Sequence, residues 1–265
     1  MKGHKGWVVA FAGAMLLSGA AMGAPGQTKE LTVDELVAKV IAARGGIEKI
    51  RGIQAQRVTG TISFGPGADG PFAVELKRPG KMRMELTLQG MNMVRSYDGR
   101  SAGWANNPFI GKKDVEPMTE VDLKNIGEES DFDGPLVDYK AKGNEIKLVG
   151  KDTVEGKEAW RLQLTTKNGN ARSYLFDAQT FLLLKWEGKR KAPDGSEFAV
   201  ESFFRDYREL NGLKFAFEID SDRPGQPGVQ KILVDKIELN PTIDDARFGK
   251  PALPAAPPSA PPPSN

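Results

Sequence analysis

The sequence predicts a mainly β protein with minor α-helical content, built around one large antiparallel sheet. From residue 54 onward, apolar and polar residues alternate along the chain, as they do in strands that bury one face. Turn dipeptides such as Asn211-Gly212 recur roughly every 10–14 residues, a spacing that favours a meander of hairpins over βαβ units. Signals for helices are confined to residues 32–53 and to one interruption in the middle of the chain.

The first helix is predicted to begin at Thr32 and to end at Gly45-Gly46. Thr32 and Glu35 have the spacing of a capping box, in which each side chain binds the backbone N–H of the other residue. The apolar residues that follow share one helical face: Val33, Leu36, Val37, Val40 and Ile41. The two glycines favour a helix end, and a second short helical turn is expected over residues 47–53.

The first run of strands is predicted between residues 54 and 104. Its clearest segment is 82–88, where Met82, Met84, Leu86 and Leu88 alternate with polar residues. Gln89-Gly90 predicts a turn, residues 91–97 return, and a short strand surrounds Trp104.

Residues 106–143 break the strand pattern and are predicted as loop with a short helix over Met118–Ile126. Such an interruption in a compact β domain is consistent with a functional lid and equally with a surface excursion. Strands resume near Ile146, and the last is expected over residues 229–239. So many antiparallel strands must curl or split, and the pattern leaves a closed barrel, a sandwich and a half-open barrel as alternatives.

Both ends of the chain are predicted to lie outside the folded domain. Lys2 and Lys5 precede an uncharged apolar stretch over residues 7–21 and a small-x-small site, which is the order of a secretory signal peptide. We therefore expect a signal peptide over 1–23, cleaved near Gly23/Ala24, and a periplasmic protein. The domain is expected over 24–250, followed by a disordered Pro-rich tail over 251–265.

Composition restricts the chemistry. The only histidine is His4, within the expected signal peptide, and there is no cysteine. Histidine-based triads, Cys–His dyads and zinc sites with His or Cys ligands are therefore excluded in the mature chain, and we expect no metal and no cofactor. Without Lys2 and Lys5, the 37 basic residues fall to 35, equal to the 35 acidic residues. This balance argues against nucleic acid as a partner.

Carboxylates are the remaining candidates for catalysis or metal binding. Glu75, Glu85 and Glu201 could supply a glycosidase-like pair, but alternating charge on the solvent face of strands explains them better. The acidic run over residues 128–133 could bind calcium, yet it lacks further ligands at the required spacing. We interpret this run as a solvated loop.

An apolar stripe is the strongest candidate for a binding site. Methionine is flexible and polarisable, which suits surfaces that accept varied apolar ligands. We predict one wall of a pocket for acyl chains, with ordinary core packing as the alternative. The candidate lipid-binding residues are Met82, Met84, Leu86, Leu88, Met91, Met93, Trp104 and Phe109.

Several segments resemble the LolA/LolB-like family, a group of outer-membrane lipoprotein-sorting-like periplasmic carriers. The resemblance covers roughly residues 30–250, and its motifs are mainly strand and turn patterns. They include the first helix with Arg44-Gly45-Gly46, then Gly134–Lys140, Tyr174–Asp177, Asp206–Gly212, Asn240-Pro241 and Phe248. The Pro-rich tail and the length of the central insertion depart from the short carriers.

This resemblance implies an unclosed β-barrel with helices over its concave face. It also implies an apolar cavity that holds the acyl chains of a lipoprotein, or another lipid, during transport across the periplasm. Membrane-bound donor or acceptor proteins would be partners, no catalysis is implied, and we expect a monomer. The alternative is a non-enzymatic envelope sensor or protein-interaction module with the same fold.

Overall fold

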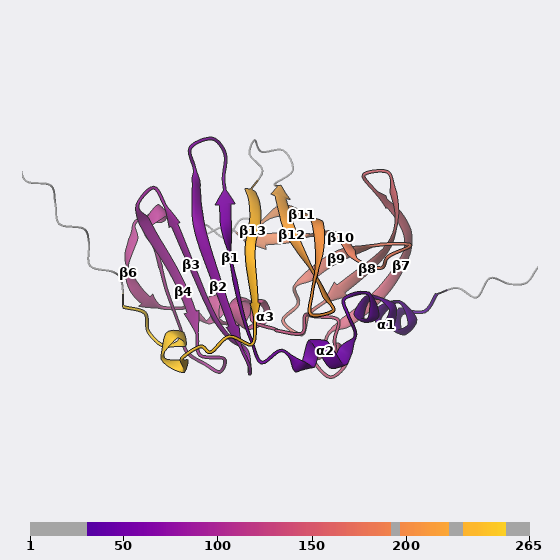
Figure 1. The fold of residues 1–265 in the computed structure, drawn as a ribbon, viewed down its shortest axis with the longest axis horizontal. Coiled ribbons are helices and arrows are strands. Elements are labelled where there is room, and N and C mark those ends of the chain that lie inside the picture. Colours follow the sequence, from indigo (N-terminus) through magenta and orange to yellow (C-terminus); the bar gives the residue numbers. More distant parts are fainter. Residues whose placement is uncertain (1–30, 192–196, 223–229, 253–265) are drawn as a thin grey trace, which may run out of the picture. The chain divides into compact units, whose positions relative to one another are not determined.

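The computed structural model describes residues 31–191, 197–222 and 230–252, and within them 13 strands form one antiparallel sheet (Figure 1). The spatial order is β6-β5-β4-β3-β2-β1-β13-β12-β11-β10-β9-β8-β7. The strands are β1 (Ala55–Ser63), β2 (Asp69–Lys77), β3 (Lys81–Leu88), β4 (Met91–Tyr97), β5 (Gly103–Asn107), β6 (Lys112–Pro117), β7 (Glu145–Val154), β8 (Lys157–Thr165), β9 (Ala171–Asp177), β10 (Leu183–Lys191), β11 (Glu197–Leu210), β12 (Leu213–Asp222) and β13 (Gln230–Leu239).

The sheet is not closed into a barrel. Its first and last strands in space, β6 and β7, are paired on one side only among the described residues. The sheet curls around the helix α3 (Glu120–Glu129), which contacts residues of β4 on one side and the β8–β9 turn on the other (Figure 1). Of the three architectures that the pattern leaves open, the half-open barrel is the one observed.

The two N-terminal helices follow the predictions. Helix α1 (Val33–Ala43) begins with the capping box of Thr32 and Glu35, and α2 (Ile47–Gly52) is the short second helix. Gly45 has a φ of 121° and lies against the β11–β12 turn, where a Cβ atom would be 2.2 Å from the Gly212 carbonyl oxygen. This approach lets the Lys214 N–H bind the Arg44 carbonyl at 3.0 Å.

The central insertion contains a strand that the sequence pattern misses. Residues 106–143 were expected to be loop and helix, but Lys112–Pro117 forms β6, next to the 3-10 helix η1 (Pro108–Ile110). Strand β6 is at the edge of the sheet, and five of its six residues are exposed. An edge strand with both faces in solvent carries no apolar alternation, so periodicity does not reveal it. The predicted helix is present, shifted to α3.

The acidic run over residues 128–133, at the end of α3, was expected to be a solvated loop. It instead makes ion pairs and hydrogen bonds with other parts of the chain. Asp133 accepts two hydrogen bonds from Arg78, and these bonds hold the pKa of Asp133 below its ordinary value. Arg78 also donates to the carbonyls of Ile50 and Ile53, at 3.2 and 2.7 Å. Lys142 binds both carboxylate oxygens of Asp131 at 2.7 Å. These carboxylates tie the insertion to α2 and the β2–β3 turn.

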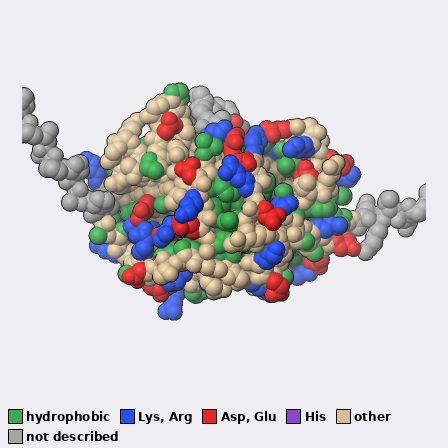
Figure 2. Space-filling model, viewed as in Figure 1, with side chains coloured by type: hydrophobic (Ala, Val, Ile, Leu, Met, Phe, Trp, Pro, Cys, Tyr) green, Lys and Arg blue, Asp and Glu red, His purple; other side chains and the backbone are tan. Residues whose placement is uncertain are grey.

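A C-terminal segment covers part of the sheet's outer face. Phe248, in the 3-10 helix η2 (Asp245–Phe248), packs in a cluster with Ala55 and Ile243. Arg247 binds Glu75 at 2.5 Å, and Glu75 is 4% exposed. The expected solvent position of Glu75 is therefore wrong, because η2 buries this carboxylate between two arginines. Elsewhere, charges of both signs are interspersed on the face seen in Figure 2.

The expected signal peptide over 1–23 and the expected Pro-rich tail beyond Ala252 lie outside the described residues. Among the helices of the described part of the chain, none is both long and apolar enough to cross a membrane.

Candidate functional site

The strand register places the apolar stripe on the face of the sheet that α3 covers. In antiparallel strands, directly paired residues point to the same face. Met82 pairs with Tyr97, and both pack in one cluster with Ile126 of α3. The pairing of Leu86 with Met93 extends the same face along β3 and β4.

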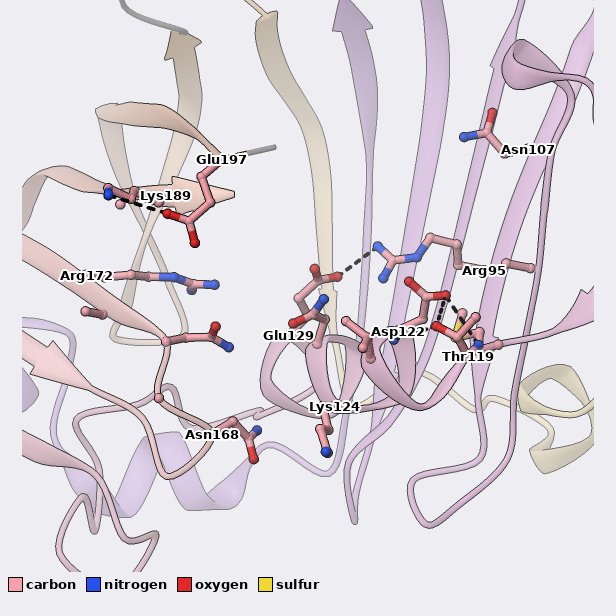
Figure 3. A pocket seen from close by; sticks show the side chains of 18 of the residues that line it. Arg95, Asn107, Thr119, Asp122, Lys124, Glu129, Asn168, Arg172, Lys189 and Glu197 are labelled. Atoms are coloured by element: carbon pink, nitrogen blue, oxygen red, sulfur yellow. Dashed lines mark hydrogen bonds and ion pairs between the residues drawn. The ribbon is translucent and has the colours of Figure 1, made fainter. Parts of the chain in front are cut away.

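A large open cavity lies on this face, with a volume of about 1210 Å³. It is bounded by β4, β5 and β6, by α3, and by the ends of β8, β9, β10 and β11 (Figure 3). This volume exceeds the roughly 300–1,000 Å³ of most small-molecule sites. The cavity is therefore large enough for an extended ligand.

Polar residues line both sides of the cavity, and the larger apolar residues gather on one of them. On the side of β4–β6 and α3, the apolar lining residues are Met93, Ala105, Ile110, Pro117, Met118 and Val121. On the side of β8–β11, the lining is largely polar and includes Gln163, Asn168, Asn170, Arg172, Ser173 and Lys189. On the side of β4–β6 and α3, ten polar or charged residues stand beside the six apolar ones, so the lining is mixed, whereas an apolar cavity was expected.

The predicted stripe residues occupy several environments. Met93 lines the cavity. Met82 is 7% exposed beneath α3, and Leu86 is 3% exposed against Ile62 and Phe72. Met84 is half-buried beside the Met82 cluster. Most of the stripe therefore packs in the core below the cavity, and Met93 marks its floor.

The remaining candidates lie toward the edges of this face or away from it. Leu88 and Met91 pair at the β3–β4 turn and are half-buried. Trp104 pairs with Ser96, and its neighbour Ala105 lines the cavity, so Trp104 points to the opposite face. Phe109 is 36% exposed in η1, next to the cavity-lining residue Ile110.

Helix α3 is capped at its start and contacts both arms of the sheet through its last turn. Thr119 and Asp122 form a capping box at its start. Near its end, Glu129 binds Arg95 of β4 at 2.9 Å (Figure 3). Glu128 accepts hydrogen bonds from Thr166 and Asn170, at the β8–β9 turn. The helix thus bridges the two arms of the curled sheet.

Two arginines face the cavity from opposite arms, Arg95 from β4 and Arg172 from β9 (Figure 3). Neither arginine was among the predicted site residues. Each arginine stands at a strand position where the alternation calls for an inward-facing apolar residue. Arg95 continues the series Met91, Met93, and Arg172 stands two residues before Tyr174. A basic residue at an inward position of a strand is the signal that could have identified them.

Arg172 lies over the Trp186 ring, with 5.3 Å between the guanidinium carbon and the ring centroid. Gly188 is the residue paired with Arg172, and a Cβ atom there would be 3.1 Å from the arginine Cγ. Burial raises the pKa of the Tyr174 phenol, and the charge of the nearby Arg172 partly opposes that shift. The glycine leaves room for the arginine side chain to pass over the indole.

The described residues contain no group of three or more Asp, Glu, His or Cys side chains that could hold a metal ion. The carboxylates considered for glycosidase-like chemistry form ion pairs with basic residues. Arg247 binds Glu75 and Glu85, and Lys185 binds Glu201.

No protein-family model and no curated protein sequence matches the chain. Solved structures do match it. A DUF1329 family protein from Desulfovibrio piger is 15% identical with a TM-score of 0.56, and the match covers 82% of this chain and 96% of the other. A putative outer membrane lipoprotein-sorting protein domain from Vibrio parahaemolyticus is 11% identical with a TM-score of 0.53, over 82% and 95% of the chains.

A LolA superfamily protein from Nitrosomonas europaea is 12% identical with a TM-score of 0.53, over 83% of this chain and 99% of the other. At these identities the similarity concerns the fold. Together with the unclosed antiparallel sheet and the helix across its concave face, it shows that the chain has a LolA/LolB-like fold.

Proposed function

We propose that this protein is a non-enzymatic binding or carrier protein of the periplasm that holds the acyl part of a lipid or lipoprotein in its concave cavity. The observation that carries the proposal is the cavity of about 1210 Å³, whose lining includes a group of apolar residues from β4–β6 and α3, called the apolar wall below. The fold of the lipoprotein-sorting domain and the LolA superfamily protein supports the same reading.

The apolar wall supplies the driving force for binding. Met93, Met118 and Val121 present flexible or exposed aliphatic groups, and Val121 is 61% exposed. Covering such surface with an acyl chain gains about 25 cal/mol for each Å² of apolar area removed from water. Methionine side chains adapt to chains of different shape. We propose Met93 as the part of the apolar stripe that contacts the ligand, with Leu88 and Met91 farther along the same face.

Apolar residues at the rim suggest where a donor or acceptor protein would touch. Ile110 is 57% exposed, Val121 is 61% exposed, and both line the cavity. Phe109 lies beside Ile110 in η1. A partner that covers these side chains would contact the ligand at the same time, as transfer of an apolar ligand requires.

Uptake of a fluorescent long-chain fatty acid tests the proposal. The informative variant is Ala105→Trp, because Ala105 pairs with Arg95 and lines the cavity. The matched control is Lys236→Trp, on a lysine of β13 that is 66% exposed and does not line the cavity. We expect saturable uptake by the wild type and by Lys236→Trp, and loss of uptake in Ala105→Trp. Equal uptake by all three proteins, or no uptake by the wild type, would contradict the proposal.

A further inference from the structure

We propose that Arg172 is the anion-binding element of the cavity, so that the ligand is an amphiphile whose head carries a phosphate or carboxylate group. This inference rests on the proposed function and specifies its ligand class. It begins from the positive charge of Arg172, which extends from β9 toward α3 and the Arg95–Glu129 pair (Figure 3).

The guanidinium of Arg172 is uncompensated. Among the residues that the structure describes, no carboxylate forms an ion pair with it, and the side chain recorded as a hydrogen-bonding neighbour is the phenol of Tyr174, which carries no charge to balance it. Its position over Trp186 supports one face of the guanidinium and leaves the N–H groups at its edge available. Arginine at such a site is suited to bind two oxygens of one phosphate or carboxylate group.

The neighbouring carboxylates do not supply the missing negative charge, because most of them are already bound. Glu129 pairs with Arg95, and Glu197 pairs with Lys189 at 3.4 Å. Glu187 lies between Arg161 and Lys185, and Asp122 accepts hydrogen bonds from Thr119. The lining as a whole carries five basic and five acidic residues, so an anionic head group would be drawn to Arg172 as a guanidinium without an ion-pair partner, not by a net positive charge of the cavity.

Apolar side chains on the sheet support Arg172 from below, while its other side faces the cavity. The register places Leu164 and Tyr174 on the same face as Arg172 and Trp186, and both are buried. Val200 is paired with Gly188 and is 7% exposed. An ionic hydrogen bond made in such surroundings is stronger than one made in water. The absent side chain at Gly188 is what allows the arginine to lie on Trp186.

The cavity lining offers separate places for the head group and the acyl chain of one ligand. Arg172 belongs to the polar side, together with Asn168, Asn170 and Ser173. Met93 and Met118 line the cavity on the side of β4–β6 and α3. An amphiphile can thus place its head at Arg172 while its chain covers the opposite wall. A neutral lipid would leave the charge of Arg172 without a partner.

The test compares the affinities of ligands that share one chain. Hexadecyl phosphate, hexadecanol and inorganic phosphate are titrated by calorimetry into the full chain and its variants. We expect the wild type to bind hexadecyl phosphate about ten- to a hundredfold more tightly than hexadecanol, as one charged hydrogen-bonded pair provides. Inorganic phosphate should bind far more weakly, because it lacks the chain.

Three variants test whether the preference for hexadecyl phosphate over hexadecanol depends on Arg172. Arg172→Gln should bind both amphiphiles with the affinity that the wild type has for hexadecanol. Gly188→Val should give the same loss by displacing the arginine from Trp186, and it provides a second variant if Arg172→Gln fails to fold. Arg208→Gln is the matched control, because Arg208 also lies over an aromatic ring, Phe217, but is exposed and paired with Asp206. It should keep the preference.

The outcomes separate this inference from the proposed function. If hexadecanol binds and the phosphate head adds nothing, Arg172 is not an anion site, while the lipid-binding function stands. If no amphiphile binds, the proposed function itself fails. Equal affinity for inorganic and hexadecyl phosphate would also overturn the inference, since it would show a site for free anions without a chain. Retention of the preference in folded Arg172→Gln would overturn the role of this residue.

Discussion

The carboxylate of Asp133 receives hydrogen bonds from both terminal nitrogens of Arg78, at 2.5 and 3.0 Å. Arg78 belongs to the β2–β3 turn, and Asp133 follows α3 within the central insertion. The same guanidinium binds two carbonyls at the end of α2 and lies over the Phe132 ring. This contact joins the insertion, the N-terminal helices and the sheet, so the position of α3 over the cavity depends on it.

Replacing the carboxylate, in Asp133→Asn, should lower the free energy of unfolding at pH 7 by about 1.5–3 kcal/mol, the value of a hydrogen bond to a charged group. The pKa of Asp133 is lowered in the folded state, chiefly by the Arg78 hydrogen bonds, so its contribution is complete above the unfolded pKa of about 3.9. It is lost as the pH falls through the lower, folded pKa.

Urea unfolding at several pH values checks this prediction. The difference between wild type and Asp133→Asn should be constant from pH 7 to pH 5 and should shrink below about pH 4. Asp138→Asn is the control, because Asp138 forms an ion pair with Arg51 in which both side chains are more than half exposed. Its effect should stay within about 1 kcal/mol. Equal effects of the two variants would show that the Arg78–Asp133 contact does not hold the insertion.

Two adjacent glycines allow the cost of backbone strain on substitution to be measured apart from the cost of a steric clash. Gly45 and Gly46 both have positive φ values, 121° and 92°. A Cβ atom on Gly45 would meet the Gly212 carbonyl oxygen at 2.2 Å, whereas one on Gly46 would meet nothing within 4 Å. Each alanine variant therefore carries backbone strain of about 1–3 kcal/mol.

Gly45→Ala should carry an additional cost, because the α1–α2 corner must move away from the β11–β12 turn. Thermal unfolding of the two variants measures the difference directly, and we expect the lower midpoint for Gly45→Ala. A midpoint for Gly46→Ala equal to or below that of Gly45→Ala would contradict the contact between this corner and the turn.

Loss of its N-cap should loosen α3. Thr119→Ala removes the side-chain acceptor for the Asp122 N–H, at a cost of about 1 kcal/mol. Because α3 contacts the core through Leu123 and Ile126 and its first turn through neither, we expect amide exchange over residues 120–125 to accelerate about fivefold. Thr32→Ala, at the equivalent cap of α1, is the matched control and should accelerate exchange in α1 alone. Unchanged exchange in α3 would contradict the role of its cap.

Sequence periodicity predicted the fold where local and tertiary demands agree. The local sequence allows a single interpretation of three features, and the structure confirms each of them: the capping box at Thr32, the two glycines after α1 and the alternation in β3. The edge strand β6 was missed because both its faces are exposed. The half-open architecture depends on the absence of pairing between β6 and β7, which follow one another in the chain but are separated by α3, and only the resemblance anticipated it.

The candidate site was harder to predict than the fold. Alternation identifies the residues that point inward, but it does not separate the core beneath a cavity from its lining. Met82 and Met93 belong to one stripe, yet the first lies under Ile126 and the second lines the cavity, because α3 covers only one end. The polar side comes from strands about 70–100 residues away in sequence, and no local pattern relates Arg172 to Met93.

Native mass spectrometry of the full chain, purified from the envelope of the cells that express it, tests the central claim most directly. The account predicts a population with the added mass of a lipid or an acyl-bearing ligand, and a marked decrease of that population in Ala105→Trp but not in Lys236→Trp. A wild-type protein that carries no such mass, and acquires none on incubation with lipid extract, would contradict it.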